Sequence, residues 1–197
     1  MRTRRAATPV WVKALLILVG VGVPTWWLAD RHDRITNQHR LEAIASHIAG
    51  RAVEVRCPGP IGRVFGGWDT VEGSVRFDAD GAPEDSTKLR KTSCAELDAV
   101  AEGRRDAELA CVERRLDCGP RARAVARAVD VVTHEAFHLQ GIIDEAETEC
   151  HSLRAMGWTA ERLGATEAQG RALARLQFAT GLPLMPARYQ KGDCPVP

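Results

Sequence analysis

The chain has 197 residues, of which 45% are hydrophobic, and this is enough for one domain with its own core plus an accessory segment. Its 27 basic and 26 acidic residues give a net charge of +1, so the chain lacks the basic excess that marks nucleic-acid binding. We therefore expect no nucleic-acid partner.

The first predicted element is an apolar helix at residues 10–29, with the sequence VWVKALLILVGVGVPTWWLA. A helix of about 20 residues is long enough to cross a bilayer. Three arginines precede it, and Trp26 and Trp27 lie at its far end, where amphipathic rings favour the membrane interface. The positive-inside rule then predicts that residues 1–9 are cytoplasmic and that residues 30–197 form an extracytoplasmic domain.

Two other interpretations of this apolar segment fit the sequence less well. A cleaved signal peptide needs small residues at its cleavage site, but the segment TWWLAD has Trp and Leu there. A buried soluble helix is disfavoured because nothing polar interrupts residues 14–23. We therefore expect an uncleaved signal anchor and a single-pass protein of the cell membrane.

The cysteines support an exported domain. All six follow the predicted anchor, and an even number in an exported domain predicts three disulfides, with fifteen possible pairings that the sequence does not rank. No CxxC pair is present, which argues against a cysteine zinc knuckle or a thioredoxin-like site. The six positions are Cys57, Cys94, Cys111, Cys118, Cys150 and Cys194.

A helix and a small sheet are expected after the anchor. Residues 33–50 place apolar side chains at helical spacing and stop at a glycine, which predicts a helix leading out of the membrane. Residues 52–57 alternate, residues 70–81 give a second strand before an Asp-Gly turn, and residues 87–94 can form a third. We expect these strands to pair as a minor antiparallel sheet.

Five helices are expected beyond the sheet. A capping-box pattern starts the first at Ser93, and Pro120 is tolerated in the first turn of the long third helix, which ends at Gly141. Asp144 and Thr166 are the expected N-caps of the last two helices. The expected ranges are 93–103, 104–115, 119–141, a helix from 144 and a helix over 166–176, followed by an irregular tail.

The fold class that follows is α+β, mainly α. A transmembrane helix precedes a small helical domain with a minor antiparallel sheet. Apolar residues recur at intervals of three and four along the long helix and predict a stripe that faces the core. They are Val125, Val129, Val132, Ala136 and Leu139.

The last turns of this long helix contain the motif HEAFH. His134 and His138 are four residues apart, so on a helix they project from one face and can both reach a metal ion. Glu135 lies beside them, where it can accept a proton from a metal-bound water. A catalytic zinc commonly takes three protein ligands and one water, so a third ligand is expected downstream.

Two resemblances suggest different third ligands. The string HEAFHLQGIID resembles the metzincin metalloproteases, particularly the snapalysin-like branch, which implies Asp144 as the ligand and Met185 as a Met-turn. The string DEAETE resembles the second metal-binding helix of thermolysin-like gluzincins. That resemblance implies Glu145 as the ligand and Glu149 as the carboxylate that supports a metal-binding histidine from behind.

The gluzincin-like assignment is the preferred one. Asp144 is needed as a helix N-cap, which turns its side chain back onto backbone donors, and a helix follows at once where the metzincin arrangement expects a turn. Only six residues separate His138 from Glu145, fewer than in gluzincins, so a tight connection between two antiparallel helices is required. The resemblance covers about 25 residues, as expected of a motif match rather than of a whole fold.

These motifs predict a zinc metallopeptidase that hydrolyses peptide bonds of a peptide or protein substrate outside the cytoplasmic membrane. His134, His138 and Glu145 would hold Zn²⁺ and Glu135 would act as general base. His151 and Tyr189 are candidates for stabilising the transition state.

A second interpretation remains open. The chain can also be a disulfide-stabilised, membrane-tethered binding or structural domain with a structural or degenerate metal site. In a structural site, His151 or Asp144 would fill the water position. Glu147 and His151, four residues apart, can form another metal pair, although a polar helix face is the preferred interpretation of that spacing.

Overall fold

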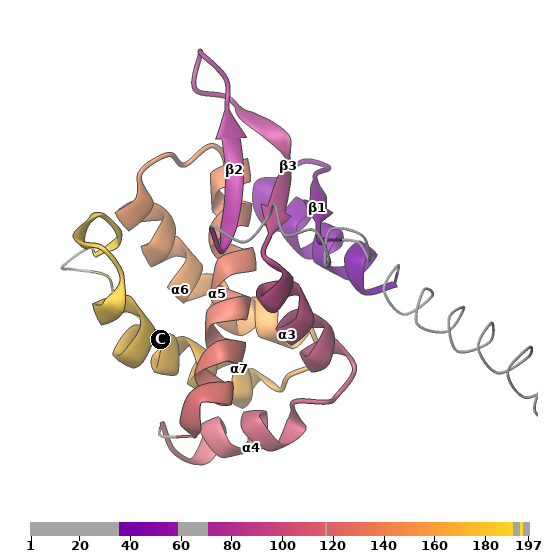
Figure 1. The fold of residues 1–197 in the computed structure, drawn as a ribbon, viewed down its shortest axis with the longest axis vertical. Coiled ribbons are helices and arrows are strands. Elements are labelled where there is room, and N and C mark those ends of the chain that lie inside the picture. The colour runs from indigo at the N-terminus through magenta and orange to yellow at the C-terminus, as the bar shows by residue number, and fades with distance from the viewer. Residues whose placement is uncertain (1–35, 59–70, 117, 191–193, 195–197) are drawn as a thin grey trace, which may run out of the picture. The chain divides into compact units, whose positions relative to one another are not determined.

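The computed structural model describes residues 36–58, 71–116, 118–190 and 194. These residues are mainly helical and include a small three-stranded sheet (Figure 1). No helix among them is long and apolar enough to cross a membrane. The predicted anchor at residues 10–29 lies outside the described residues.

The sheet is mixed, with strand order β1-β3-β2. Strands β2 (Gly73–Phe77) and β3 (Pro83–Leu89) form the expected antiparallel hairpin. Strand β1 (Glu54–Arg56) pairs with β3 in parallel, so the prediction of an all-antiparallel sheet was wrong. Alternation along a strand sets which side chains face the core but does not encode the direction of a partner that is distant in sequence.

A disulfide lies at the end of the parallel β1–β3 pair. Cys57 follows β1 directly, Cys94 lies shortly after the end of β3, and the two are bonded. The bond therefore joins the same ends of β1 and β3, which is compatible with a parallel pair. The other two disulfides link Cys111 with Cys118 and Cys150 with Cys194, so the expectation of three disulfides is confirmed.

The start of the first helix after the sheet differs from the prediction. Helix α3 runs over Lys91–Ala101, and its N-cap Arg90 makes no side-chain capping bond. Ser93 is buried inside the helix, where its hydroxyl donates to a carboxylate oxygen of Glu72. The predicted capping box at Ser93 was wrong, because this side chain binds a neighbouring segment of the fold instead of its own helix end.

The remaining helices agree closely with the expected ranges. A helix covers residues 36–49, and Thr166 with Gln169 forms the expected capping box. The irregular tail contains three short turns, the π-helical η1 and the 3₁₀ turns η2 and η3. The bounds are α4 (Asp106–Arg114), α5 (Gly119–Gln140), α6 (Glu145–Arg162), α7 (Glu167–Leu176), η1 (Gln177–Gly181), η2 (Leu182–Leu184) and η3 (Ala187–Tyr189).

Helix α5 is the central element of this domain. In Figure 1 it runs between α3 and α6 and below the β2–β3 hairpin, and it packs on all of these elements. All five residues of its predicted stripe are buried. A helix with neighbours on several sides holds its last turns in a fixed position, and those turns carry the HEAFH motif.

Candidate metal centre

The connection between α5 and α6 is tight because Gly141 ends α5 in a left-handed conformation, with φ of 108°. A side chain there would be strained, so glycine suits the position. The amide of Ile142 donates to the carbonyl of Phe137 at 3.2 Å. Helix α6 then begins at once, because the Asp144 carboxylate caps it by accepting from the amide of Glu147 at 2.8 Å.

This connection brings three ligand atoms from two helices together. The Nε2 atoms of His134 and His138 are 3.0 Å apart. One carboxylate oxygen of Glu145 lies 3.1 Å from the first and 3.3 Å from the second. The three residues form a group that could hold a metal ion. Within the described part of the chain, Asp144 does not join this group, and its carboxylate serves as the cap.

Each histidine ring also has a hydrogen-bond partner at its second nitrogen, Nδ1. His134 Nδ1 lies 3.0 Å from a carboxylate oxygen of Glu149, and His138 Nδ1 lies 2.7 Å from the carbonyl oxygen of Ile142. Both partners accept hydrogen bonds, which assigns the ring protons to the two Nδ1 atoms. In its neutral form each ring then presents an Nε2 lone pair toward Glu145, which is the tautomer that a metal ligand needs.

The three converging ligand atoms would be stabilised by a cation between them. Two imidazole lone pairs and a carboxylate oxygen face one another within 3.3 Å, and such acceptors repel unless a proton or a metal ion lies among them. Burial lowers the pKa of His134, but hydrogen bonds to Glu145 and Glu149 outweigh it and raise the pKa to about 10. A hydrogen bond from His134 lowers the pKa of Glu145. Two imidazoles and one carboxylate are a donor set suited to zinc.

Glu135 follows His134 on α5, and its side chain lies against the sheet. A Cβ atom at Gly73 of β2 would be 2.5 Å from one of its carboxylate oxygens, so a larger residue there would displace the Glu135 side chain. The second oxygen, Oε2, is buried without a hydrogen-bond partner in the described part of the chain. Burial raises the pKa of Glu135 to about 7, so the carboxyl group can take up and release a proton near neutrality.

A buried polar network behind Glu149 was not predicted from the sequence. Asp130, one turn before His134 on α5, accepts from the hydroxyl of Ser152 at 2.7 Å and from the amide of Gln177 at 2.8 Å. Burial, reinforced by the nearby Glu149, raises the pKa of Asp130 to about 8. Helical spacing predicts that Asp130 lies on the same face of α5 as His134. Its partner Gln177 is 47 residues away in the sequence, and helical spacing does not predict that contact.

A cleft of about 280 Å³ opens beside the metal centre. It is bounded by the start of β2, by one face of α5 and by the η2–η3 segment. His134 and Glu135 line it together with Met185 and Tyr189, and the Tyr189 ring lies 5.7 Å from that of His134. His151 does not line the cleft, and its ring packs against Phe137. Of the two candidate stabilising groups, the cleft contains Tyr189.

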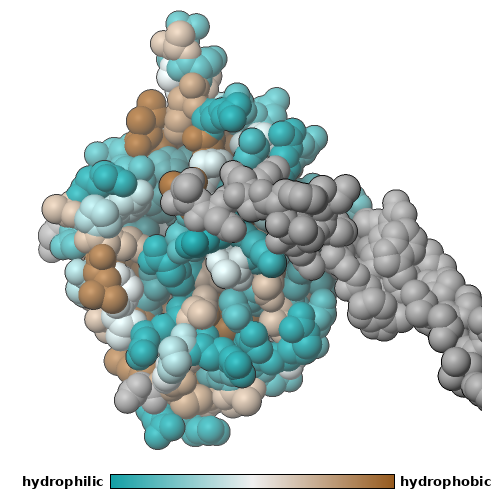
Figure 2. Space-filling view, viewed as in Figure 1, coloured by the Kyte–Doolittle hydropathy of each residue, from teal (hydrophilic) through white to brown (hydrophobic). Residues whose placement is uncertain are grey.

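Exposed hydrophobic side chains occur at the rim of this cleft. Val71 is 57% exposed and Leu184 is 85% exposed, and both line the cleft. The face of the molecule in Figure 2 is mostly hydrophilic, with hydrophobic side chains in separate patches. The cleft therefore offers apolar contacts next to a polar centre.

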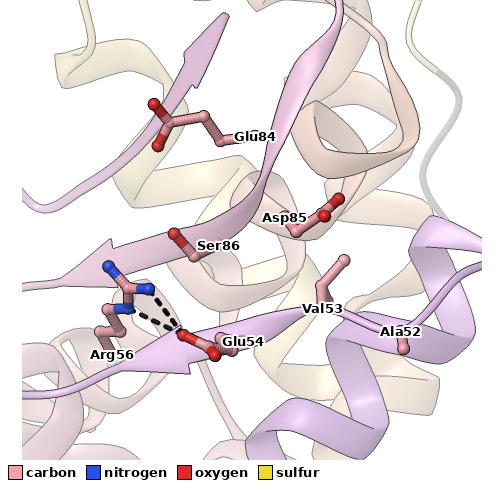
Figure 3. Close-up of a pocket in the computed structure, with 7 residues that line it drawn as sticks. All are labelled: Ala52, Val53, Glu54, Arg56, Glu84, Asp85 and Ser86. Carbon is pink, nitrogen blue, oxygen red and sulfur yellow. Dashed lines mark hydrogen bonds and ion pairs between the residues drawn. The ribbon is translucent and has the colours of Figure 1, made fainter.

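A larger hollow, of about 640 Å³, lies at the other edge of the sheet along β1 and β3. Figure 3 shows Glu54 paired with Arg56 there, and Asp85 is paired with Arg51. Two of its three carboxylates are thus neutralised by neighbours. It contains none of the HEAFH residues, and we assign it no role.

A comparison of the chain with protein-family models, curated proteins and solved structures found no match. The likeness to zincins thus rests on the HEAFH and DEAETE residues alone, and the fold of the described residues adds no independent sign of that family. Any function must be argued from the geometry of the metal centre and its cleft.

Proposed function

We propose that the protein is a zinc-dependent metallopeptidase that hydrolyses peptide bonds. The observation that carries the proposal is the convergence of His134, His138 and Glu145, with each imidazole fixed by an acceptor on its outer nitrogen. Three protein ligands leave a fourth zinc position for water, which is the pattern of catalytic sites, whereas structural sites are closed by four protein ligands.

In the proposed hydrolysis, Glu135 transfers the proton, and Glu149 and the Ile142 carbonyl orient the zinc ligands. Bound zinc supplies Lewis-acid chemistry and makes water more acidic. Glu135 accepts the proton of the attacking water and later delivers it to the leaving amine, a task suited to a carboxyl group whose pKa is raised to about 7 by burial. Glu149 and the Ile142 carbonyl keep the two imidazoles oriented.

The cleft is the proposed substrate site. Among the described residues, strand β2 lies at the edge of the sheet and its start lines the cleft, so an extended peptide can pair with the backbone groups of its outer edge. Val71 and Leu184 are available for apolar side chains of the substrate. Tyr189, which also lines the cleft, is the proposed hydrogen-bond donor to the developing oxyanion.

The alternative is a structural metal site in a membrane-tethered binding domain. Both interpretations share His134, His138 and Glu145. The structural one adds His151 or Asp144 as a fourth ligand, and only the enzyme gives Glu135 a role. Within the described part of the chain, Oε2 of Glu135 is buried beside the cleft without a hydrogen-bond partner. This favours the enzyme, because such an oxygen costs stability and occurs often at functional sites.

Replacement of Glu135 tests the proposal. Full-length protein in neutral detergent, loaded with zinc, should cleave members of a peptide library that mass spectrometry can follow. Glu135→Gln should retain one zinc and lose roughly 10²- to 10⁴-fold in rate, the usual contribution of a general base. The control, Glu147→Gln on the exposed face of α6, should retain full activity. Zinc-loaded wild type that cleaves no library peptide would contradict the proposed activity.

The proposed location is the outer side of the cytoplasmic membrane, held by residues 10–29. Its support is the apolar sequence of that segment and the three disulfides of the domain, which persist in oxidising compartments. Protease added to intact cells should degrade the domain beyond residue 30. A domain that is degraded only after cell lysis would contradict this location.

A further inference from the structure

A second pocket, of about 290 Å³, lies between the first described helix (residues 36–49) and α6. It shares no lining residue with the cleft at the metal centre. Its lining residues are Arg40, Ala43, Ile44, His47, Trp158 and Arg162. Neither the zinc site nor the proposed hydrolysis accounts for this set of side chains.

Trp158 organises the polar groups of this pocket. The His47 ring stacks on the Trp158 ring, with centroids 4.5 Å apart and planes inclined by 22°. The Arg162 guanidinium lies over the same ring, 5.2 Å from its centroid. Contacts of this kind hold a cation over an aromatic face while leaving its hydrogen-bond donors available.

The pocket has basic side chains without acidic ones. Arg40 donates to the carbonyl of Ala101 at 3.3 Å, which leaves most of its five N–H donors. Within the described ranges, no carboxylate forms an ion pair with Arg40, His47 or Arg162. Some arginines elsewhere in the domain are paired, as Arg105 is with Glu96 at 2.6 Å. This pocket therefore concentrates unneutralised positive charge.

We propose that this pocket binds a phosphate group. Two guanidinium groups and an imidazole supply donors in the planar, forked arrangement that phosphate oxygens accept. The Trp158 ring supplies an apolar surface for the carbon atoms attached to that phosphate. The donors come from two helices, so a ligand here would also tie the first described helix to α6.

Two sources of phosphate are compatible with this chemistry. One is a soluble phosphate and the other is the headgroup of an anionic phospholipid. Arg40 follows the end of the predicted anchor, Ala29, by eleven residues, and a chain of that length spans at most about 40 Å. Lipid headgroups are therefore within reach of the pocket, and Trp with basic residues is a combination suited to the membrane interface.

A binding titration separates these sources. Full-length protein in neutral detergent is titrated calorimetrically with inorganic phosphate, with dihexanoyl phosphatidylglycerol and with zwitterionic dihexanoyl phosphatidylcholine. The test variant is the double replacement Arg40→Gln with Arg162→Gln. The matched control is Arg123→Gln with Arg175→Gln, which removes the same charge from two exposed positions of α5 and α7.

We expect saturable binding of at least one of the two anionic ligands to wild type. The test variant should bind it at least tenfold more weakly, and the control should bind it like wild type. Binding of phosphate alone identifies a soluble ligand, and tighter binding of phosphatidylglycerol identifies a lipid headgroup. Equal losses in both double variants, or no saturable binding of either anion, would overturn the proposal.

Discussion

Helix α6 contributes to two groups of histidine and glutamate side chains that differ in their surroundings. The inner group, His134, His138, Glu145 and Glu149, has contacts of 3.0 to 3.3 Å. The outer pair is Glu147 and His151, whose nearest charged atoms are 3.9 Å apart. The His134 side chain is 9% exposed and the His151 side chain is 40% exposed.

The difference shows that residue type and spacing do not by themselves make a metal site. HEAFH and the outer pair both place their partners four residues apart on a helix. At the inner site, the Nδ1 nitrogen of each imidazole donates to a fixed acceptor. Helices α5 and α6, which carry these residues, pack closely against each other. The outer side chains are more exposed, so a metal ion would have to order them at an entropic cost.

The largest expected effect is on zinc affinity, which should fall when a histidine of the inner group is replaced but not when His151 of the outer pair is replaced. His138→Ala should weaken zinc binding by more than the 10- to 100-fold that loss of an outer partner typically costs, because it removes a ligand atom. His151→Ala should leave zinc affinity unchanged. Competition with a chromogenic chelator measures both affinities. Equal weakening in the two variants would show that the surroundings of the inner group are unimportant.

The next effect concerns the support behind His134. Glu149→Gln removes the charge that orients this imidazole and should weaken zinc binding about 10- to 100-fold. Glu147→Gln, a change of the same chemistry on the outer pair, is the control and should bind zinc as wild type does. An unchanged affinity in Glu149→Gln would mean that the helix backbone alone orients the ring.

A further effect appears in the dependence of stability on pH. Burial raises the pKa of Asp130 to about 8 in the folded state, against about 3.9 in an unfolded chain. Between these values the folded protein binds one more proton, so the free energy of unfolding should fall as pH rises from about 4 to about 8. Asp130→Asn cannot titrate and should lose this slope.

Urea unfolding of metal-free protein at several pH values measures the Asp130 effect. The difference in unfolding free energy between wild type and Asp130→Asn should shift in favour of the variant as pH rises, and it should become constant above about pH 8. His151→Ala, a replacement on the exposed face of α6, serves as the control. A difference that does not vary with pH would contradict a neutral buried Asp130.

The smallest expected effect distinguishes the two candidate third ligands. Asp144 caps α6 through the amide of Glu147, and Asp144→Ala should cost about 1 kcal/mol of stability, the usual value for loss of an N-cap. Zinc stoichiometry should stay at one. Asp144→Asn keeps a capping side chain and should restore most of the stability. Loss of zinc from Asp144→Ala would favour the metzincin-like ligand set.

Local signals predicted much of the site. The stripe along α5, the Gly141 stop and the Asp144 cap are properties of short segments, and each is seen in the structure. Together they place Glu145 in the first turn of α6, facing the two imidazoles. The tight connection was predictable because a helix stop and a helix cap lay only three residues apart.

Long-range contacts were not predictable in the same way. The parallel pairing of β1 depends on a partner about 30 residues away. Ser93 was assigned as a cap from its local sequence, but its hydroxyl bonds to Glu72, which is 21 residues away in the sequence. The contact of Gln177 with Asp130 likewise spans 47 residues. In each case the local pattern was compatible with several partners, and tertiary packing selected one.

The most direct test of the central claim is the zinc content of two matched variants, Glu145→Gln and Glu147→Gln, purified as full-length protein and measured by mass spectrometry of the metal. Both remove one carboxylate from the first turn of α6. The inner position should lose zinc and the outer position should retain one zinc per chain. Equal zinc content in the two variants would contradict the assignment of His134, His138 and Glu145 as the metal centre.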